Sequence, residues 1–221
     1  MKHEIIVTGD GSKTIYLPEL DETYHSSHGS LQEAMHVFIQ NGLSIIDSNK
    51  VSVFEMGFGT GLNALLTAIE TNKVSGKQVY YEGIEAYPVA FDIAMEMDYC
   101  KLVGEQYQSV FKFLHETSWK EVHCFSEQFS FQKIHEKIED YQPKREQFDI
   151  VYYDAFGPRA QEAMWTPEIL QKMYDMLRVG GFLVTYCAKG QVKRDLKALG
   201  FEIEALPGPP GKREMTRAWK R

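Results

Sequence analysis

The segment VSVFEMGFGTGLNALLTAI, residues 51–69, restricts the possible folds of this 221-residue chain more than any other part of the sequence. An apolar run predicts a buried β-strand, three alternating glycines follow it, and an apolar run with helical spacing comes next. Glycine reaches backbone conformations closed to other residues, and the first turn of a helix has free N–H groups. This order is typical of α/β proteins that bind ligands beyond the carboxyl ends of parallel strands.

The spacing around this turn indicates the kind of ligand. Glu55 precedes Gly57, Gly59 and Gly61, and Leu62 follows them. A dinucleotide-binding turn requires a glycine at the position of Leu62, and a phosphate-binding Walker loop requires a Gly-Lys-Ser/Thr ending, which is absent. An acidic residue before the turn instead suits a ligand with an ammonium group and no phosphate, because carboxylate and ammonium groups pair well. S-adenosylmethionine is such a ligand; a purely structural glycine turn is the alternative.

The rest of the chain alternates between predicted strands and helices, which indicates a largely parallel sheet. Strands are expected over residues 51–56, 78–85, 122–125, 148–154, 182–187, 201–206 and 215–220. The segment PGPPGKRE between the last two strands is too short for a crossover helix, so these strands must be antiparallel neighbours. The predicted fold class is therefore α/β, with a Rossmann-like, seven-stranded sheet whose terminal strand is antiparallel. This is the plan of class I S-adenosylmethionine-dependent methyltransferases.

The ends of the next two strands supply candidate cofactor contacts. Glu85 ends the strand at 78–85, where a carboxylate can accept hydrogen bonds from both ribose hydroxyls. Glu82 is the competing residue, but we expect it within the strand. Ser126, Glu127 and Gln128 follow the predicted strand at 122–125 and are the candidates for contacts with adenine.

Asp154, at the end of the fourth predicted strand, is the candidate catalytic residue. An irregular turn, Ala-Phe-Gly-Pro, follows it. A carboxylate there can orient an incoming amine towards the methyl group and receive a proton; a helix cap or turn residue is the alternative. Tyr24, Phe156 and Trp165 could stack on a nucleobase or belong to the core, and the core is the better prediction for Trp165.

Residues 1–50 are expected to form an extension that packs on a methyltransferase domain of residues 51–221. Residues 4–17 alternate in polarity around a Gly-Asp-Gly-Ser cluster, which predicts a β-hairpin. A helix is expected from residue 31, with Ser30 and Glu33 as a capping box.

Composition excludes several classes of protein. No apolar run approaches the length of a membrane span, the first residues lack the apolar core of a secretion signal, and three scattered cysteines favour the cytoplasm. The histidines lack metal-ligand spacing, so we expect no metal. The net charge is −7, yet residues 189–221 carry nine basic and four acidic residues. This basic segment could guide a polyanion, although a solvated charged surface explains it equally well.

Six segments together resemble a known family. They are DETYHSSHGSLQEAMHVFI, FEMGFGTGLNALL, GIEAYP, DAFGPRAQEAMW, GGFLVTYCAKGQVKRDLKALGF and GKREMTRAW. They resemble the methyltransferase domain of the tRNA-modifying MnmC proteins and their stand-alone MnmD-type relatives, over nearly the whole chain. The resemblance implies methylation of the exocyclic amine of 5-aminomethyl(-2-thio)uridine at the tRNA wobble position.

The resemblance also implies roles for particular residues. Asp154 corresponds to the catalytic aspartate, and the cofactor site corresponds to Glu55, Gly57, Gly59, Gly61, Asn63 and Glu85. Tyr24 and Glu33 fall in the segment that lines the substrate site. Lys189, Arg194, Lys212 and Arg213 are candidates for contacts with tRNA phosphates.

Bifunctional members of this family carry a flavin-dependent oxidase domain that this sequence lacks. We therefore expect no flavin, the methylation step alone, and a separate enzyme that supplies the aminomethyl precursor. An N-methyltransferase for small molecules is the second hypothesis; a nicotinamide oxidoreductase and a non-catalytic scaffold are weaker ones.

Overall fold

The computed structural model describes residues 3–221. Its strands are β1 (Glu4–Val7), β2 (Lys13–Leu17), β3 (Glu22–Thr23), β4 (Lys50–Met56), β5 (Gln78–Glu85), β6 (His123–Cys124), β7 (Phe129–His135), β8 (Phe148–Tyr153), β9 (Leu177–Thr185), β10 (Phe201–Pro207) and β11 (Glu214–Lys220). Its α-helices are α1 (Ser30–Ala34), α2 (Leu62–Asn72), α3 (Phe91–Glu96), α4 (Tyr99–Val103), α5 (Gln108–Glu116), α6 (Pro167–Met176) and α7 (Gly190–Ala198).

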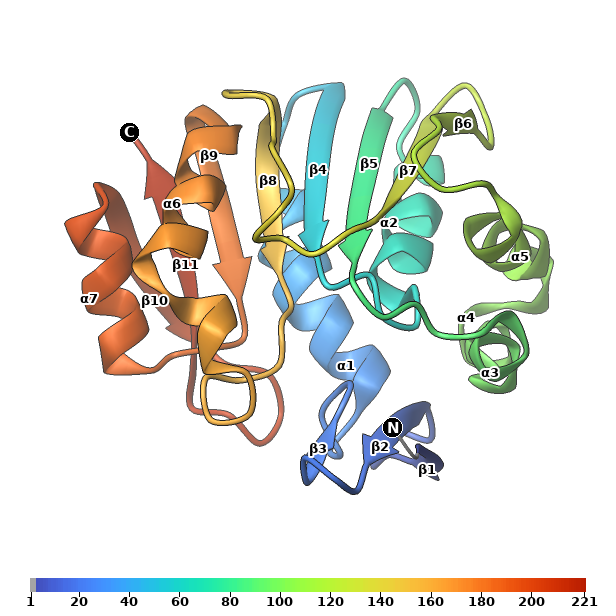
Figure 1. Cartoon of the computed structure of the whole chain (residues 1–221). Coiled ribbons are helices and arrows are strands. Elements are labelled where there is room, and N and C mark those ends of the chain that lie inside the picture. The colour runs from blue at the N-terminus through green and yellow to red at the C-terminus, as the bar shows by residue number, and fades with distance from the viewer. Residues whose placement is uncertain (1–2) are drawn as a thin grey trace.

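Eight strands form the central sheet, in the order β10-β11-β9-β8-β4-β5-β7-β6. The five strands from β9 to β7 run parallel, β11 is antiparallel to both of its neighbours, and β6 is antiparallel at the other edge. Helices α2 and α5 pack on one face of this sheet, and α6 and α7 pack on the other (Figure 1). The fold is thus the predicted α/β sheet with an antiparallel hairpin at its carboxyl-terminal edge.

The apolar residues of β4 explain its central position. Val51 and Val53 belong to the cluster on one face of the sheet, and Phe54 and Met56 belong to the cluster on the other. Because successive side chains of a strand point to opposite faces, a strand with apolar residues on both faces must be covered on both sides.

The predicted third strand is wrong. Residues 123–124 form only the short edge strand β6, and the place beside β5 belongs to β7, which begins at Phe129. Lys133 interrupts the apolar pattern by which this strand could be predicted from the sequence. Its side chain occupies a buried position, 3% exposed. Its ammonium group donates hydrogen bonds to the carbonyl oxygens of Leu114 and His115 at the end of α5, which accounts for its burial.

The amino-terminal segment folds as a hairpin, as predicted, with β1 paired to β2 and the short β3 added. The capping box is wrong, because Gly29 is the N-cap of α1 and Ser30 is its first residue. The turn of the hairpin caps the helix instead: Asp10 accepts a hydrogen bond from the Gln32 amide at 2.9 Å, and Ser12 accepts one from Ser30 at 3.1 Å. The Glu33 carboxylate instead accepts hydrogen bonds from the Ser26 amide and from Lys212.

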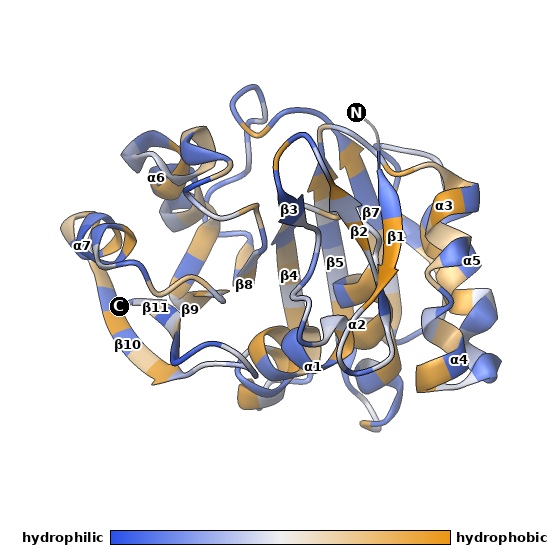
Figure 2. Cartoon of the chain, turned by 90° about the horizontal axis from the view of Figure 1, so that it is seen from below, coloured by the Kyte–Doolittle hydropathy of each residue, from blue (hydrophilic) through white to orange (hydrophobic). Residues whose placement is uncertain are grey.

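The three-stranded sheet lies against the carboxyl ends of the parallel strands. Figure 1 shows it below the tips of β4 and β5, and Figure 2, from below, shows it across the same strands. Ile15 and Leu17 of β2 share an apolar cluster with Leu62 of α2, which fixes the sheet to the main body. Across residues 3–221, no helix has the length and apolarity needed to cross a membrane.

Candidate active site

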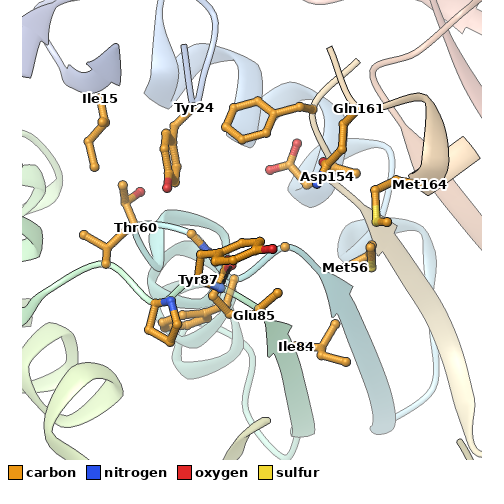
Figure 3. Close-up of a pocket in the computed structure, with 18 of the residues that line it drawn as sticks. Ile15, Tyr24, Met56, Thr60, Ile84, Glu85, Tyr87, Asp154, Gln161 and Met164 are labelled. Atoms are coloured by element: carbon orange, nitrogen blue, oxygen red, sulfur yellow. Dashed lines mark hydrogen bonds between the residues drawn. The ribbon is translucent and has the colours of Figure 1, made fainter. Parts of the chain in front are cut away.

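A cavity of about 820 Å³ lies at the carboxyl ends of β4, β5, β7 and β8. The three-stranded sheet and the turn after β8 complete its walls (Figure 3). Its lining includes Ile15, Leu17, Tyr24, Met56, Gly57, Phe58, Gly59, Thr60, Asn63, Ile84, Glu85, Tyr87, Ile138, Asp154, Phe156, Gln161 and Met164. A pocket at this edge is where an open α/β sheet binds its ligand.

The glycine turn between β4 and α2 forms the floor of this cavity. Gly57, Gly59 and Gly61 have φ angles of +91°, +52° and +76°, which L-residues with side chains rarely adopt. A Cβ atom at Gly57 would lie 3.0 Å from the carbonyl oxygen of Asp154, and one at Gly59 would lie 3.3 Å from the Tyr24 ring. Glycine is therefore required here for both conformation and space, and the turn brings Asp154 and Tyr24 to the same site.

Glu85 connects the end of β5 to the glycine turn. One carboxylate oxygen accepts a hydrogen bond from the Gly59 amide at 2.9 Å, and the other accepts one from the Tyr87 amide at 2.9 Å. These contacts fix the direction of the carboxylate, and Glu85 lines the cavity. Such a carboxylate fits the hydroxyl groups of a ribose.

A second pair of carboxyl groups shares one amide donor. Nδ2 of Asn63 donates hydrogen bonds to Glu55 at 2.9 Å and to Asp154 at 2.8 Å. Glu55 is fully buried, and this burial raises the pKa of its carboxyl group well above the usual range. Among the described residues, neither Oε2 of Glu55 nor Oδ1 of Asn63 has a hydrogen-bond partner. Asn63 lines the cavity, so its Oδ1 can accept a hydrogen bond from the ammonium group of a ligand; Glu55 is not among the lining residues and holds the Asn63 amide in place.

Asp154 directly follows β8 and faces the cavity (Figure 3). The pKa of its carboxyl group is raised to about 7, mainly by burial and also by the nearby Glu33 carboxylate. The hydrogen bond from Asn63 and the charge of Lys212 act in the opposite direction. Within the described part of the chain, no donor bonds to the other oxygen, Oδ1, so it is available to a substrate.

Aromatic rings stand next to this carboxylate. The Tyr24 and Phe156 rings pack edge to face, 5.2 Å apart, and both line the cavity. Burial raises the pKa of the Tyr24 hydroxyl to about 12, so it stays neutral. Trp165 is 5% exposed, packs on Tyr153 and donates its indole N–H to the Phe156 carbonyl at 2.8 Å, so it belongs to the core as expected.

The residues predicted to contact adenine lie elsewhere. Ser126 and Glu127 precede β7 and are at its amino end, whereas the cavity is at its carboxyl end. Ser126 accepts hydrogen bonds within its own turn, and Gln128 donates to carbonyl groups after α2, among them Val74 at 2.9 Å. The structure does not support these three as adenine contacts, because the sequence prediction placed the strand too early.

The cavity is instead lined by the last residue of β7 and the four residues that follow it, which the sequence analysis did not identify. They are His135, Glu136, Lys137, Ile138 and Glu139. The alternation of Phe129 and Phe131 was the signal that could have found them.

The predicted basic residues separate into two groups. Lys189, Lys212 and Arg213 line a second hollow of about 540 Å³, together with Arg159 and Tyr186. Arg194 does not line this hollow and contacts Gln191 of its own helix.

No group of three or more His, Cys, Asp or Glu residues in positions 3–221 could hold a metal ion.

Comparisons with known proteins agree with this geometry. A family described as S-adenosyl-L-methionine-dependent methyltransferases matches residues 96–221. The tRNA 5-methylaminomethyl-2-thiouridine biosynthesis bifunctional protein MnmC of Cupriavidus metallidurans is 30% identical over 97% of this chain, which covers 33% of that protein. The protein of the same name from Cupriavidus necator is 29% identical over 92% of this chain and 32% of its own length. The chain thus spans about a third of the length of these relatives.

A solved structure shows the same fold. MNMC2 from Aquifex aeolicus superposes with a TM-score of 0.79 and 22% identity, covering 100% of this chain and 70% of that chain. The glycine turn, the Glu85 carboxylate and the buried acceptors around Asn63 fit S-adenosylmethionine, the cofactor of the matching family. The chain belongs to this family of S-adenosyl-L-methionine-dependent methyltransferases.

Proposed function

We propose that the chain methylates the exocyclic amine of 5-aminomethyl(-2-thio)uridine at the tRNA wobble position, giving the methylaminomethyl form. The observation that carries this proposal is the carboxyl group of Asp154, which is held by Asn63 and has one oxygen available in the cavity. The names of the relatives over 97% and 92% of the chain support the substrate.

The cofactor site uses residues at three strand ends. S-adenosylmethionine supplies a methyl group on a positively charged sulfur. Glu85 would accept hydrogen bonds from the ribose hydroxyls, and Oδ1 of Asn63 would accept one from the ammonium group. The segment after β7, including Ile138, takes the place of the predicted adenine contacts.

Asp154 orients the amine of the substrate and accepts its proton. A protonated amine cannot attack, and a nearby carboxylate favours the protonated form. A pKa of about 7 allows Asp154 to accept that proton near neutral pH. S-adenosylmethionine would supply its methyl group to the freed nitrogen lone pair, and Asp154 would then release the proton to solvent. Tyr24 and Phe156 hold the uracil ring between the cofactor and the surface.

The second hollow provides the contact with tRNA. Lys189 and Arg213 are exposed there, and no described residue forms an ion pair with either of them. Cationic side chains beside the cavity mouth can bind the phosphates that flank the target nucleotide. A tRNA substrate places the protein in the cytoplasm.

The test is transfer of labelled methyl groups to tRNA that carries 5-aminomethyluridine, followed by nucleoside analysis. We expect methylaminomethyluridine with the wild-type protein, and none with tRNA that lacks the aminomethyl group. Asp154→Asn should bind S-adenosylmethionine but lose at least about 100-fold in turnover, because a general base contributes about that much. Transfer to free aminomethyluridine and small amines, with none to tRNA, would favour the small-molecule reaction.

A further inference from the structure

Lys212, in the loop between β10 and β11, connects that loop to the active site. Its ammonium group forms an ion pair with Glu33 of α1 and lies 3.7 Å from the centre of the Tyr186 ring. The Tyr186 hydroxyl donates to the carbonyl oxygen of Ala155 at 2.8 Å, directly after the candidate catalytic residue. Three segments far apart in the sequence therefore meet at Lys212.

Glu33 is the carboxylate whose charge this lysine offsets. It is 7% exposed, and its second oxygen accepts a hydrogen bond from the Ser26 amide at 2.9 Å. An ionised carboxylate this buried needs a cationic partner, because burial removes most of its hydration. Lys212 is the only described residue that forms an ion pair with it.

Asp154 experiences the charges of this pair. The negative charge of Glu33 raises the pKa of Asp154, and the positive charge of Lys212 lowers it. The other groups that face Asp154 come from the elements packed around it: Glu55 of β4, Tyr81 of β5, Asn63 of α2 and Tyr186 after β9. Among these neighbours, Lys212 is the one that carries a positive charge.

On the basis of the proposed function, we propose that Lys212 is a positioning residue for catalysis: it neutralises Glu33, so that Asp154 receives the proton of the substrate amine. Without Lys212, the unpaired Glu33 carboxylate would attract the substrate ammonium group and keep Asp154 protonated. The amine would then retain its proton and its lone pair could not form the N–C bond. The aromatic contact with Tyr186 holds the ammonium group in place.

This role differs from a contact with RNA phosphate. The ammonium group of Lys212 is already engaged by Glu33 and Tyr186, whereas its neighbour Arg213 is exposed and has no ion pair within the described residues. Arg213→Met is therefore a matched control that removes a cation from the same loop and leaves the pair intact.

The experiment measures the titration of Asp154 directly, by carboxyl ¹³C NMR, and the acidic limb of the pH profile of kcat. Lys212→Met should move both upwards by about one pH unit, and Glu33→Gln should move both downwards. The double variant should return close to the wild type, and Lys212→Arg should retain the wild-type limb. Lys212→Gln provides a second neutral variant if Lys212→Met does not fold.

The outcomes are distinct. An unchanged titration in Lys212→Met, with only a higher KM for tRNA as in Arg213→Met, would overturn the inference and make Lys212 a contact with RNA. A double variant that keeps the shift of Lys212→Met would also overturn it. If the NMR titration shifts as expected but no variant methylates tRNA, the electrostatic role stands and the proposed substrate fails.

Discussion

A single amide group, Nδ2 of Asn63, holds two carboxyl groups in the active site. One of them, Asp154, lowers the free energy of unfolding when it is ionised. Its pKa rises from an ordinary value of 3.8 to about 7, so ionisation favours the unfolded chain. This penalty is absent below about pH 4 and complete above about pH 7.

We therefore predict that Asp154→Asn raises the free energy of unfolding at pH 8, by on the order of 1–3 kcal/mol. The asparagine removes the charge and keeps an oxygen that accepts the hydrogen bond from Asn63. Urea unfolding at pH 8 and pH 5 measures the effect, which should be smaller at pH 5. A variant less stable than the wild type at pH 8 would contradict the assignment of the raised pKa.

Glu85 and Glu127 form a matched pair for cofactor binding. Glu85→Ala should weaken binding of S-adenosylmethionine by about 1.5–3 kcal/mol, because a charged hydrogen-bond partner is lost. Glu127→Ala should leave the affinity unchanged, because Glu127 is exposed at the opposite end of β7. Calorimetric titration compares the two. Equal losses of affinity in the two variants would show that Glu127 also contributes to the cofactor site.

At the scale of elements, the segment after β7 depends on α6. The ammonium group of Lys172 donates hydrogen bonds to the carbonyl oxygens of Ile138 at 2.8 Å and Tyr141 at 3.0 Å. The Tyr141 hydroxyl in turn bonds to the buried carboxyl group of Glu82. These contacts shape one wall of the cavity although none of the three polar side chains lines it.

Lys172→Met should therefore weaken S-adenosylmethionine binding several-fold and increase hydrogen exchange over residues 136–141. Gln171→Ala, on the same helix, is the control, because the Gln171 side chain donates its hydrogen bond to Asp175 of α6 and not to the segment after β7. Faster hydrogen exchange without a change in affinity would show that this wall of the cavity does not contribute to cofactor binding.

The elements that the sequence predicted well are those with a strong local pattern. The strands β4, β5, β10 and β11 match their predicted ranges within a residue or two, because apolar runs and turn residues mark them. β7 was missed because Lys133 occupies a buried position. Glu33 appeared as a helix cap because its real partner, Lys212, is 179 residues away in sequence. Contacts of this range, like the bridge from Asn63 to Asp154, depend on the assembled fold.

At the scale of the whole molecule, charge is unevenly distributed. The net charge is −7, yet Lys189 and Arg213 give the second hollow a basic rim. Binding of tRNA should weaken with salt. The slope of log K against log salt should fall by about 1.4–1.8 in Lys189→Ala/Arg213→Ala, if each residue contacts one phosphate. Lys144→Ala, an exposed lysine before β8, is the control. An unchanged slope in the double variant would place the RNA elsewhere.

The position of β4 has a consequence for synthesis on the ribosome. This strand pairs with β5 on one side and with β8 on the other, and β8 ends at Tyr153. The nascent chain therefore carries an apolar strand with one unpaired edge while about a hundred further residues are translated. Chaperone binding to nascent chains should be strongest over this interval and should decline once β8 has left the exit tunnel.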